Sequence, residues 1–214
     1  MYLDNISRYV ANGSIFEQSK QKYRKNCMGP LLLAIIAGIV PGVVLKSFWL
    51  YLSIALLVIA LSCVLGVYIV SSKTLTLTKS LILDTIIYAA WVFELCILEF
   101  MYFTMWKGVN FWILLIYLPN ILMPLFAGIK IHKGLRSSSY NVKRMTRSNI
   151  QSVGFLTGIM GMSFAAIFRD MDQNVAFIVV LLCFSILNGF MSLGLLSVQK
   201  LYYIKKYNLS DTLD

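Results

Sequence analysis

Charged residues are scarce in this sequence. Asp, Glu, Lys and Arg make up 13% of its 214 residues, about half of the roughly 25% that is usual in soluble domains. Hydrophobic residues make up 59% of the chain. This composition leaves no room for a separate soluble domain, and it predicts a chain that is embedded in a membrane over nearly its whole length.

Histidine and clustered cysteines, which most metal sites need, are also nearly missing. His132 is the only histidine, and it lies in a basic stretch. The four cysteines form no CxxC pair and are typical of free, small apolar residues: Cys27, Cys63, Cys96 and Cys183. We therefore expect neither a metal site nor a cofactor.

The motifs of common enzyme classes are absent as well. The sequence contains no GxxxxGK[ST] phosphate loop, no HExxH, no GxSxG nucleophile elbow and no GxGxxG. A hydrolase inside the membrane would need a nucleophile beside a base on one helix face, and no Ser, Thr or Cys has His132 in that position. We therefore expect a protein that is not an enzyme.

Long apolar stretches are what the sequence has instead. Each of six such stretches is long enough to cross a bilayer as a helix, which takes about 17 to 25 residues: 29–45, 48–70, 80–105, 110–129, 150–168 and 174–198. The predicted fold class is all-α: a polytopic integral membrane protein with six transmembrane helices over 29–199. Residues 200–214 are predicted to form a cytoplasmic tail, and the Lys, Ile and Asn usage suits a bacterial protein.

The first 28 residues are more polar and show a different pattern. They lack the early basic region and the cleavage site of a signal peptide. Apolar residues recur at helical spacing near the start, and Ser14 with Glu17 matches the capping box of a second short helix. We interpret 1–28 as a cytoplasmic amphipathic segment that lies on the membrane surface. Its apolar positions are Tyr2, Leu3, Ile6, Tyr9 and Val10.

The stretch 80–105 is the only apolar one that carries carboxylates inside it: Asp84, Glu94 and Glu99. A charged side chain at the bilayer centre costs about 2.5–3.5 kcal/mol on insertion scales, so it usually faces the bundle or a water-filled cavity. At about 1.5 Å per residue, Glu94 and Glu99 lie roughly 15 and 22 Å from Asp84 along the helix. The spacing predicts a polar ladder through the membrane.

Aromatic residues share the acidic side of this helix. On a wheel of about 100° per residue, Tyr88 and Trp91 fall close to Asp84, with Glu99 on one flank and Glu94 on the other. Two asparagines inside other apolar stretches complete the candidate substrate or ion pathway. Its predicted members are Asp84, Tyr88, Trp91, Glu94, Glu99, Asn120 and Asn188.

The sequence allows two alternatives to this pathway. Asp84 and Glu99 could instead lie near the two interfaces in contact with water, which leaves Glu94 as an uncharged, hydrogen-bonded side chain. Pro119 and Pro124 either break the fourth helix, as in ion-binding transporters, or only kink it.

Glycine spacing predicts which spans pack most closely. Gly38 with Gly42, and Gly154 with Gly158, form GxxxG patterns that let two helix backbones approach each other. The first and fifth spans should therefore be buried among other helices.

The basic residues fix the expected orientation. Placing both termini on one side puts 16 of the 19 Lys and Arg residues there, and leaves only Lys46, Lys107 and Arg169 on the other. The positive-inside rule then predicts cytoplasmic termini in a multi-pass protein of the cell membrane. The basic links suit anionic lipids of the bilayer, at about 1 kcal/mol per cation, and no nucleic acid partner is expected.

Two functions of different classes fit these features. The first is a permease-type transport component, such as the membrane subunit of an exporter that works with a separate cytoplasmic ATPase or another membrane subunit. The alternative is a non-transporting immunity, assembly or regulatory protein that binds another membrane protein or a peptide. A carrier that works alone is a third interpretation, for which no internal repeat gives support. No substrate is indicated by the sequence.

Overall fold

A computed structural model of the chain describes residues 2–11, 20–35, 48–71, 76–137 and 172–209. Every element in these ranges is helical, which confirms the all-α class for the described residues. The helices are α1 (Tyr2–Ala11), α2 (Lys20–Asn26), α3 (Met28–Leu33), α5 (Phe48–Ser71), α6 (Leu77–Lys107), α7 (Ile113–Arg136), α9 (Gln173–Ser192), the 3₁₀ turn η3 (Leu193–Leu195) and α10 (Leu196–Tyr207).

Among the described residues, four helices are long and apolar enough to cross a membrane: Leu50–Ser71, Leu77–Lys107, Ile113–Arg136 and Phe177–Tyr207. They correspond to the second, third, fourth and sixth predicted spans. The first span is described only as far as residue 35, and the fifth lies outside the described residues, as do both GxxxG patterns. Four such helices are compatible with a multi-pass membrane protein.

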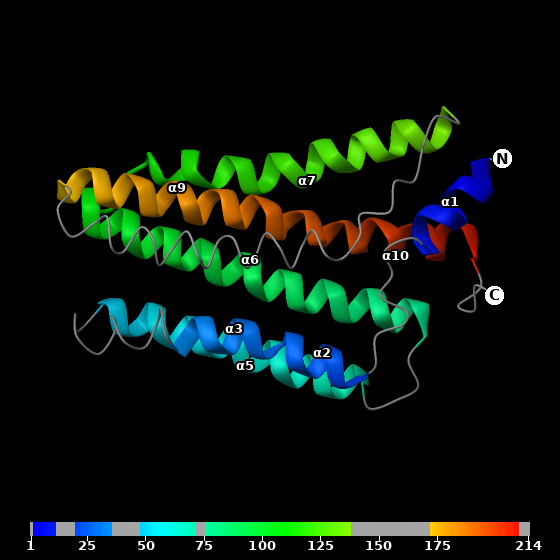
Figure 1. Cartoon of the computed structure of the whole chain (residues 1–214), viewed down its shortest axis with the longest axis horizontal. Coiled ribbons are helices and arrows are strands. Elements are labelled where there is room, and N and C mark those ends of the chain that lie inside the picture. The colour runs from blue at the N-terminus through cyan, green and yellow to red at the C-terminus, as the bar shows by residue number, and fades with distance from the viewer. Residues whose placement is uncertain (1, 12–19, 36–47, 72–75, 138–171, 210–214) are drawn as a thin grey trace.

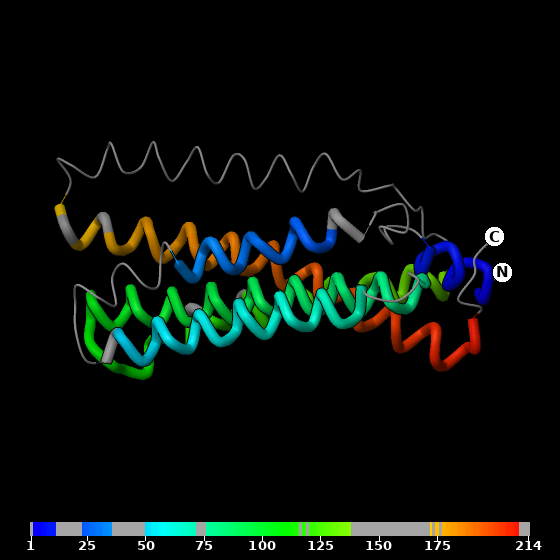
Figure 2. Tube along the Cα trace, turned by 90° about the horizontal axis from the view of Figure 1, so that it is seen from below, coloured from blue at the N-terminus to red at the C-terminus, as the bar shows by residue number. Residues whose placement is uncertain are grey.

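The long helices lie side by side in one elongated bundle (Figure 1). α7 forms one edge, α9 and α10 come next, α6 is central, and α5 lies on the opposite side with α2 and α3. A view turned by 90° shows both chain ends at the same end of the bundle (Figure 2). The helix with the carboxylates therefore occupies the interior.

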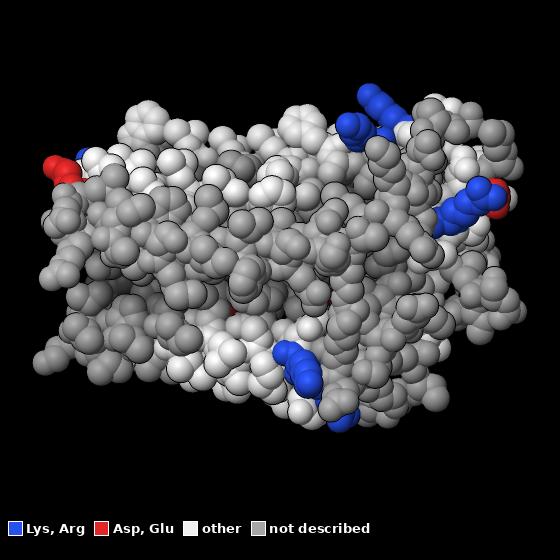
Figure 3. All heavy atoms as spheres, viewed as in Figure 1, with Lys and Arg blue, Asp and Glu red and all other residues white. Residues whose placement is uncertain are grey.

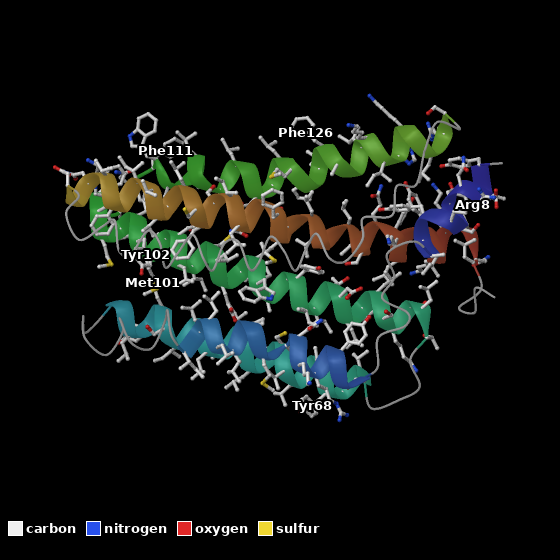
Figure 4. All side chains as sticks on the ribbon, viewed as in Figure 1. Arg8, Tyr68, Met101, Tyr102, Phe111 and Phe126 are labelled. Atoms are coloured by element: carbon white, nitrogen blue, oxygen red, sulfur yellow. The ribbon has the colours of Figure 1, made fainter. Side chains whose placement is uncertain are left out.

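Burial confirms the central position of α6. Buried residues make up 44% of its most apolar stretch, against 12% in α7. On α7, Ile121 and Phe126 are 64% and 63% exposed, and Phe111 and Phe126 point away from the bundle in Figure 4. Apolar surface of this extent suits contact with lipid rather than with water.

Local signals set the ends of α6. The Thr76 side chain accepts a hydrogen bond from the backbone N–H of Lys79 at 3.4 Å, which satisfies one of the free donors of the first turn. Gly108 follows the last turn with φ of 70°, a conformation that glycine adopts without strain. The helix therefore extends a few residues beyond the predicted 80–105 at both ends.

The sixth predicted span is longer than expected. It was predicted to end at 198, but α9 continues through η3 into α10 as far as Tyr207, and Asn208 in the left-handed conformation follows. At the other end, Asp172 accepts a hydrogen bond from the Asn174 N–H at 2.7 Å. The cations that suggested a tail instead belong to the last helical turns, where positive charge is favourable.

The fourth predicted span also differs from its expected form. α7 is continuous across Pro119 and Pro124, so the predicted alternative of a broken helix is wrong. It extends to Arg136, and therefore includes residues 130–136, which the sequence assigned to a basic link. Membrane helices tolerate internal prolines where neighbouring helices hold the freed backbone groups.

The N-terminal helix α1 packs on protein. Ile6, Tyr9 and Val10 are buried against the ends of α6, α7 and α10, in a cluster with Leu77, Leu81, Leu135 and Tyr203. The Asn5 side chain also donates to the backbone oxygen of Leu135 at 3.4 Å. Three of the five apolar positions of the predicted face are therefore covered by helix ends, whereas Leu3 is 56% exposed.

The second N-terminal helix runs along the bundle. α2 leads through Cys27 into α3, and both pack against α5. Tyr23 is fully buried and its hydroxyl is hydrogen-bonded to that of Ser80. Arg24 contacts α5 twice, through the hydroxyl of Ser71 at 3.4 Å and over the ring of Tyr68 at 4.7 Å. α2 is therefore an extension of the first predicted span rather than a separate surface helix.

Candidate functional site

Three predicted pathway residues meet inside the bundle. Glu99 of α6 accepts a hydrogen bond from Asn120 of α7, with 3.3 Å between Nδ2 and Oε2. It accepts a second from Asn188 of α9, with 3.4 Å between Nδ2 and Oε1. All three side chains are buried. Three helices that are distant in the sequence thus hold one carboxylate from two sides.

Two neighbours of this group were not found from the sequence. Asn188 Nδ2 also lies 3.2 Å from the Cys96 sulfur, and the Tyr117 hydroxyl donates to the backbone oxygen of Cys96 at 2.8 Å. Cys96 precedes Glu99 by three residues, so both lie on one face of α6. The three-residue spacing could have shown that Cys96 lies beside Glu99. It could not show which helix packs against this face of α6.

The carboxamide oxygens of this group lack partners. Within the described part of the chain, Asn120 Oδ1 and Asn188 Oδ1 are buried without a hydrogen bond. A buried acceptor without a donor costs about 1–3 kcal/mol. The group therefore contains two oxygen atoms that could contact a ligand.

Glu94 has a different environment. It is fully buried, and neither of its carboxylate oxygens has a hydrogen-bond partner among the described residues. Cys63 of α5 lies near enough to interact with its charge. Glu94 and Glu99 are about 7.5 Å apart along the axis of α6, and they face different neighbouring helices. The predicted alternative, a hydrogen-bonded Glu94, is therefore not found in these residues.

Asp84 is within electrostatic range of a cation that was predicted to lie in the tail. The charge of Asp84 interacts with that of Lys200 in α10, whose Nζ also sits 5.1 Å from the centre of the Tyr9 ring. Lys200 was missed because it was placed after the end of its helix. Asp84 and Glu99 are both buried in the bundle, so the exposure to water that the predicted alternative gave them is not found in the described residues.

The two aromatic members of the predicted face are directed to different sides of α6. The ring of Tyr88 lies against the backbone of Gly194 in η3. Trp91 lies against α3, where a Cβ added to Gly29 would come within 2.7 Å of the indole Cζ2. The single acidic and aromatic stripe of the helical wheel is therefore divided between two helix interfaces.

A second polar cluster lies at the end of the bundle where the termini are. His132 Nδ1 and the Tyr203 hydroxyl are 2.7 Å apart. Gln199 donates to the same hydroxyl at 3.3 Å, and Tyr9 donates to the Gln199 oxygen at 3.3 Å. These side chains connect α1, α7 and α10, and none of them was predicted as part of a site.

The described surface also contains an apolar pocket of about 300 Å³ between α5, α6 and α7. It is lined by Leu52, Phe93, Cys96, Ile97, Phe100 and Tyr117. Cys96 and Tyr117 are the only polar members, so the pocket does not resemble an aqueous entrance. No group of three or more His, Cys, Asp or Glu side chains suited to a metal occurs in the described ranges.

The described residues therefore belong to an all-helical protein that has helices of membrane-spanning length and carboxylates buried in its interior. Comparison with known proteins finds no family model that matches the chain, no similar curated protein and no similar solved structure. The function is therefore argued from the buried polar side chains themselves.

Proposed function

We propose that the chain is a permease-type transport component in which polar residues of α6 line a cation pathway. The observation that carries this proposal is Glu94, a fully buried carboxylate whose oxygens lack hydrogen-bond partners in the described part of the chain. Ionisable groups inside a membrane protein are costly and usually mark ion or proton routes. A carboxylate that served only to join helices would be expected to contact a donor.

The order of groups along α6 supports the same function. Asp84 with Lys200 lies toward one end, Glu94 follows about 15 Å further on, and Glu99 with its two asparagines follows about 7.5 Å beyond that. The carboxylates therefore occur at three levels along α6, with Glu94 and Glu99 on different sides of the helix.

We further propose six membrane crossings with cytoplasmic termini. α7 ends at the bundle end that carries the termini, whereas α9 begins at the opposite end (Figure 1). The segment that connects α7 to α9 must therefore pass from one end of the bundle to the other. One membrane crossing achieves this, which supports a fifth span at 150–168. Lys and Arg side chains on the face drawn in Figure 3 lie mostly between the middle of the bundle and the end with the termini, and the positive-inside rule expects the cytoplasmic end to be the more basic one.

Reporter fusions test this topology. Fusions after residues 75, 140 and 210 are expected to report a cytoplasmic position, and fusions near 108 and 171 an external one, because the basic links should stay inside. An external signal at 140 together with an internal signal at 171 would contradict the proposed orientation, and the same signal at both positions would contradict a fifth span.

Labelling of a cysteine at position 94 tests the pathway. With the four native cysteines replaced by alanine, Glu94→Cys is expected to react with a membrane-impermeant thiol reagent in sealed vesicles, because water accompanies a cation through its route. Leu98→Cys, equally buried one turn further along α6, is the matched control and should stay unlabelled. Absence of labelling at 94 from both sides of the membrane would contradict the pathway.

Co-purification then distinguishes the kinds of transport component. We propose that an exporter arrangement would dock a separate ATPase at the end of the bundle with the termini. Mild-detergent purification and mass spectrometry should then recover an ATPase in stoichiometric amount. A chain that purifies with a different membrane protein, and whose position 94 is not labelled, would instead indicate the immunity, assembly or regulatory function.

A further inference from the structure

We propose that Glu99, Asn120 and Asn188 form a binding site for a dehydrated monovalent cation, for which Na⁺ is the probe. The proposal rests on the transport function above and identifies the class of ion that the pathway would hold. Three side chains from different helices meet at this site, and the two amide oxygens beside the carboxylate are buried without a partner among the described residues.

The three side chains already meet at one point. Asn120 and Asn188 approach opposite oxygens of the Glu99 carboxylate from α7 and α9. The donor–acceptor distances of 3.3 and 3.4 Å lie just beyond the roughly 2.7–3.2 Å that is typical of N–H···O hydrogen bonds. The group is therefore closed without a cation, but it is held loosely.

Rotation of the two carboxamides would turn this group into a cation site. The last torsion of an asparagine side chain is broad and roughly two-fold, so a turn of about 180° exchanges Nδ2 for Oδ1 with little other movement. Both Oδ1 atoms are buried without a partner among the described residues. After rotation they would face the carboxylate oxygens, and a cation between them would contact all four acceptors, while the two Nδ2 groups would give up their bonds to Glu99 and take the positions that Oδ1 holds now.

The charge of the site selects a monovalent ion. The described group contains one carboxylate and two neutral amides, so one positive charge neutralises it. A divalent ion would leave an uncompensated charge inside the bundle, which is costly. The proposed ligands are all oxygen atoms, which suit alkali ions rather than metals that prefer sulfur or imidazole.

A proton is the competing ion at the same carboxylate. It would also neutralise Glu99, but the single O–H of the protonated carboxyl could donate to only one of the two amide oxygens, and its binding would not distinguish Na⁺ from other salts. The two possibilities therefore differ in their response to Na⁺ at fixed pH.

The test measures binding without a transport assay. The purified full chain is placed in lipid nanodiscs at fixed pH, and Na⁺ replaces N-methylglucamine at constant ionic strength. A ligand that binds the native state raises the melting temperature in a saturable way, so we expect a saturable rise together with binding of radioactive Na⁺. A melting temperature that depends on pH but not on Na⁺ would overturn the proposal in favour of a proton.

Paired variants locate the site. Glu99→Gln and Asn188→Ala should each abolish the Na⁺-dependent shift. Two controls should keep it: Asp4→Asn, which removes an exposed carboxylate on α1, and Asn174→Ala, at the other end of α9. A shift that persists in Glu99→Gln would overturn the assignment.

A third variant, which changes the charge of the site, serves if Glu99→Gln and Asn188→Ala fold poorly. Asn188→Asp keeps the size of the side chain and adds a second carboxylate, so the response should change from Na⁺ to Ca²⁺. A variant that still responds to Na⁺ alone would contradict the charge argument. The labelling of position 94 is independent of this result: its failure alone would overturn the pathway, whereas loss of the Na⁺ effect alone would overturn the ion.

Discussion

Replacing Glu94 with methionine is expected to stabilise the protein. Both carboxylate oxygens are buried without a partner in the described part of the chain, and a polar group in that situation costs about 1–3 kcal/mol. Methionine fills a similar space without polar atoms. For a chain of this size a gain of 1 kcal/mol corresponds to about 2–4 °C, so the melting temperature in detergent should rise by several degrees.

The matched control is Glu99→Met, for which the opposite sign is expected. That substitution leaves the amide donors of Asn120 and Asn188 without their acceptor, which costs about 1–3 kcal/mol for each group left unpaired. Two carboxylates on one helix should therefore change stability in opposite directions. A lower melting temperature in Glu94→Met would mean that this carboxylate is bonded after all, and the transport proposal would lose its main support.

Among the described glycines, Gly194 is the position where substitution by alanine is expected to destabilise the folded protein most. An added Cβ at Gly194 would overlap with Cγ and both Cδ atoms of Tyr88, which are at the end of the ring that is attached to α6 and not at its free tip. Overpacking of this kind costs about 1–3 kcal/mol, and more where the backbone must move. We expect a clear loss of folded protein in size-exclusion chromatography and a lower melting temperature.

Two further variants test the cause of this loss. At Gly66 the nearest side-chain atoms, those of Ile86, lie 3.5 Å from the position of an added Cβ. Gly66→Ala should therefore be neutral or slightly stabilising, since alanine favours a helix over glycine by about 1 kcal/mol. Combining Gly194→Ala with Tyr88→Ala should restore part of the folded yield. Equal stability of Gly194→Ala and Gly66→Ala would show that α6 and η3 are not in close contact.

The sequence predicted the acidic helix well because the cost of burying charge is large. Asp84, Glu94 and Glu99 had to face the inside of a bundle, and all three are buried in it. Helix α6 also agrees with the predicted span, apart from a few residues at each end. The apolar composition and the carboxylates were together sufficient for that result.

The partners of these carboxylates could not be predicted. Which side chain faces Glu99 depends on how α7 and α9 pack against α6, and helical periodicity within one segment contains no such information. Lys200 was missed for a related reason: a run of aromatic residues and lysines resembles the end of a membrane span, yet here the helix continues to Tyr207 because α1 packs on its last turns. The six-span count stays a prediction, since residues 36–47 and 138–171 lie outside the described residues.

The packing of α1 has a consequence for how the protein is made. The ribosome produces Ile6, Tyr9 and Val10 well before Tyr203, which is part of the surface that buries them. Domains generally fold as their segments emerge, yet this helix cannot reach its final place until Tyr203 has been synthesised. A chain that stops before Tyr203 therefore keeps the apolar face of α1 uncovered, so the docking of α1 distinguishes chains that contain α10 from chains that lack it.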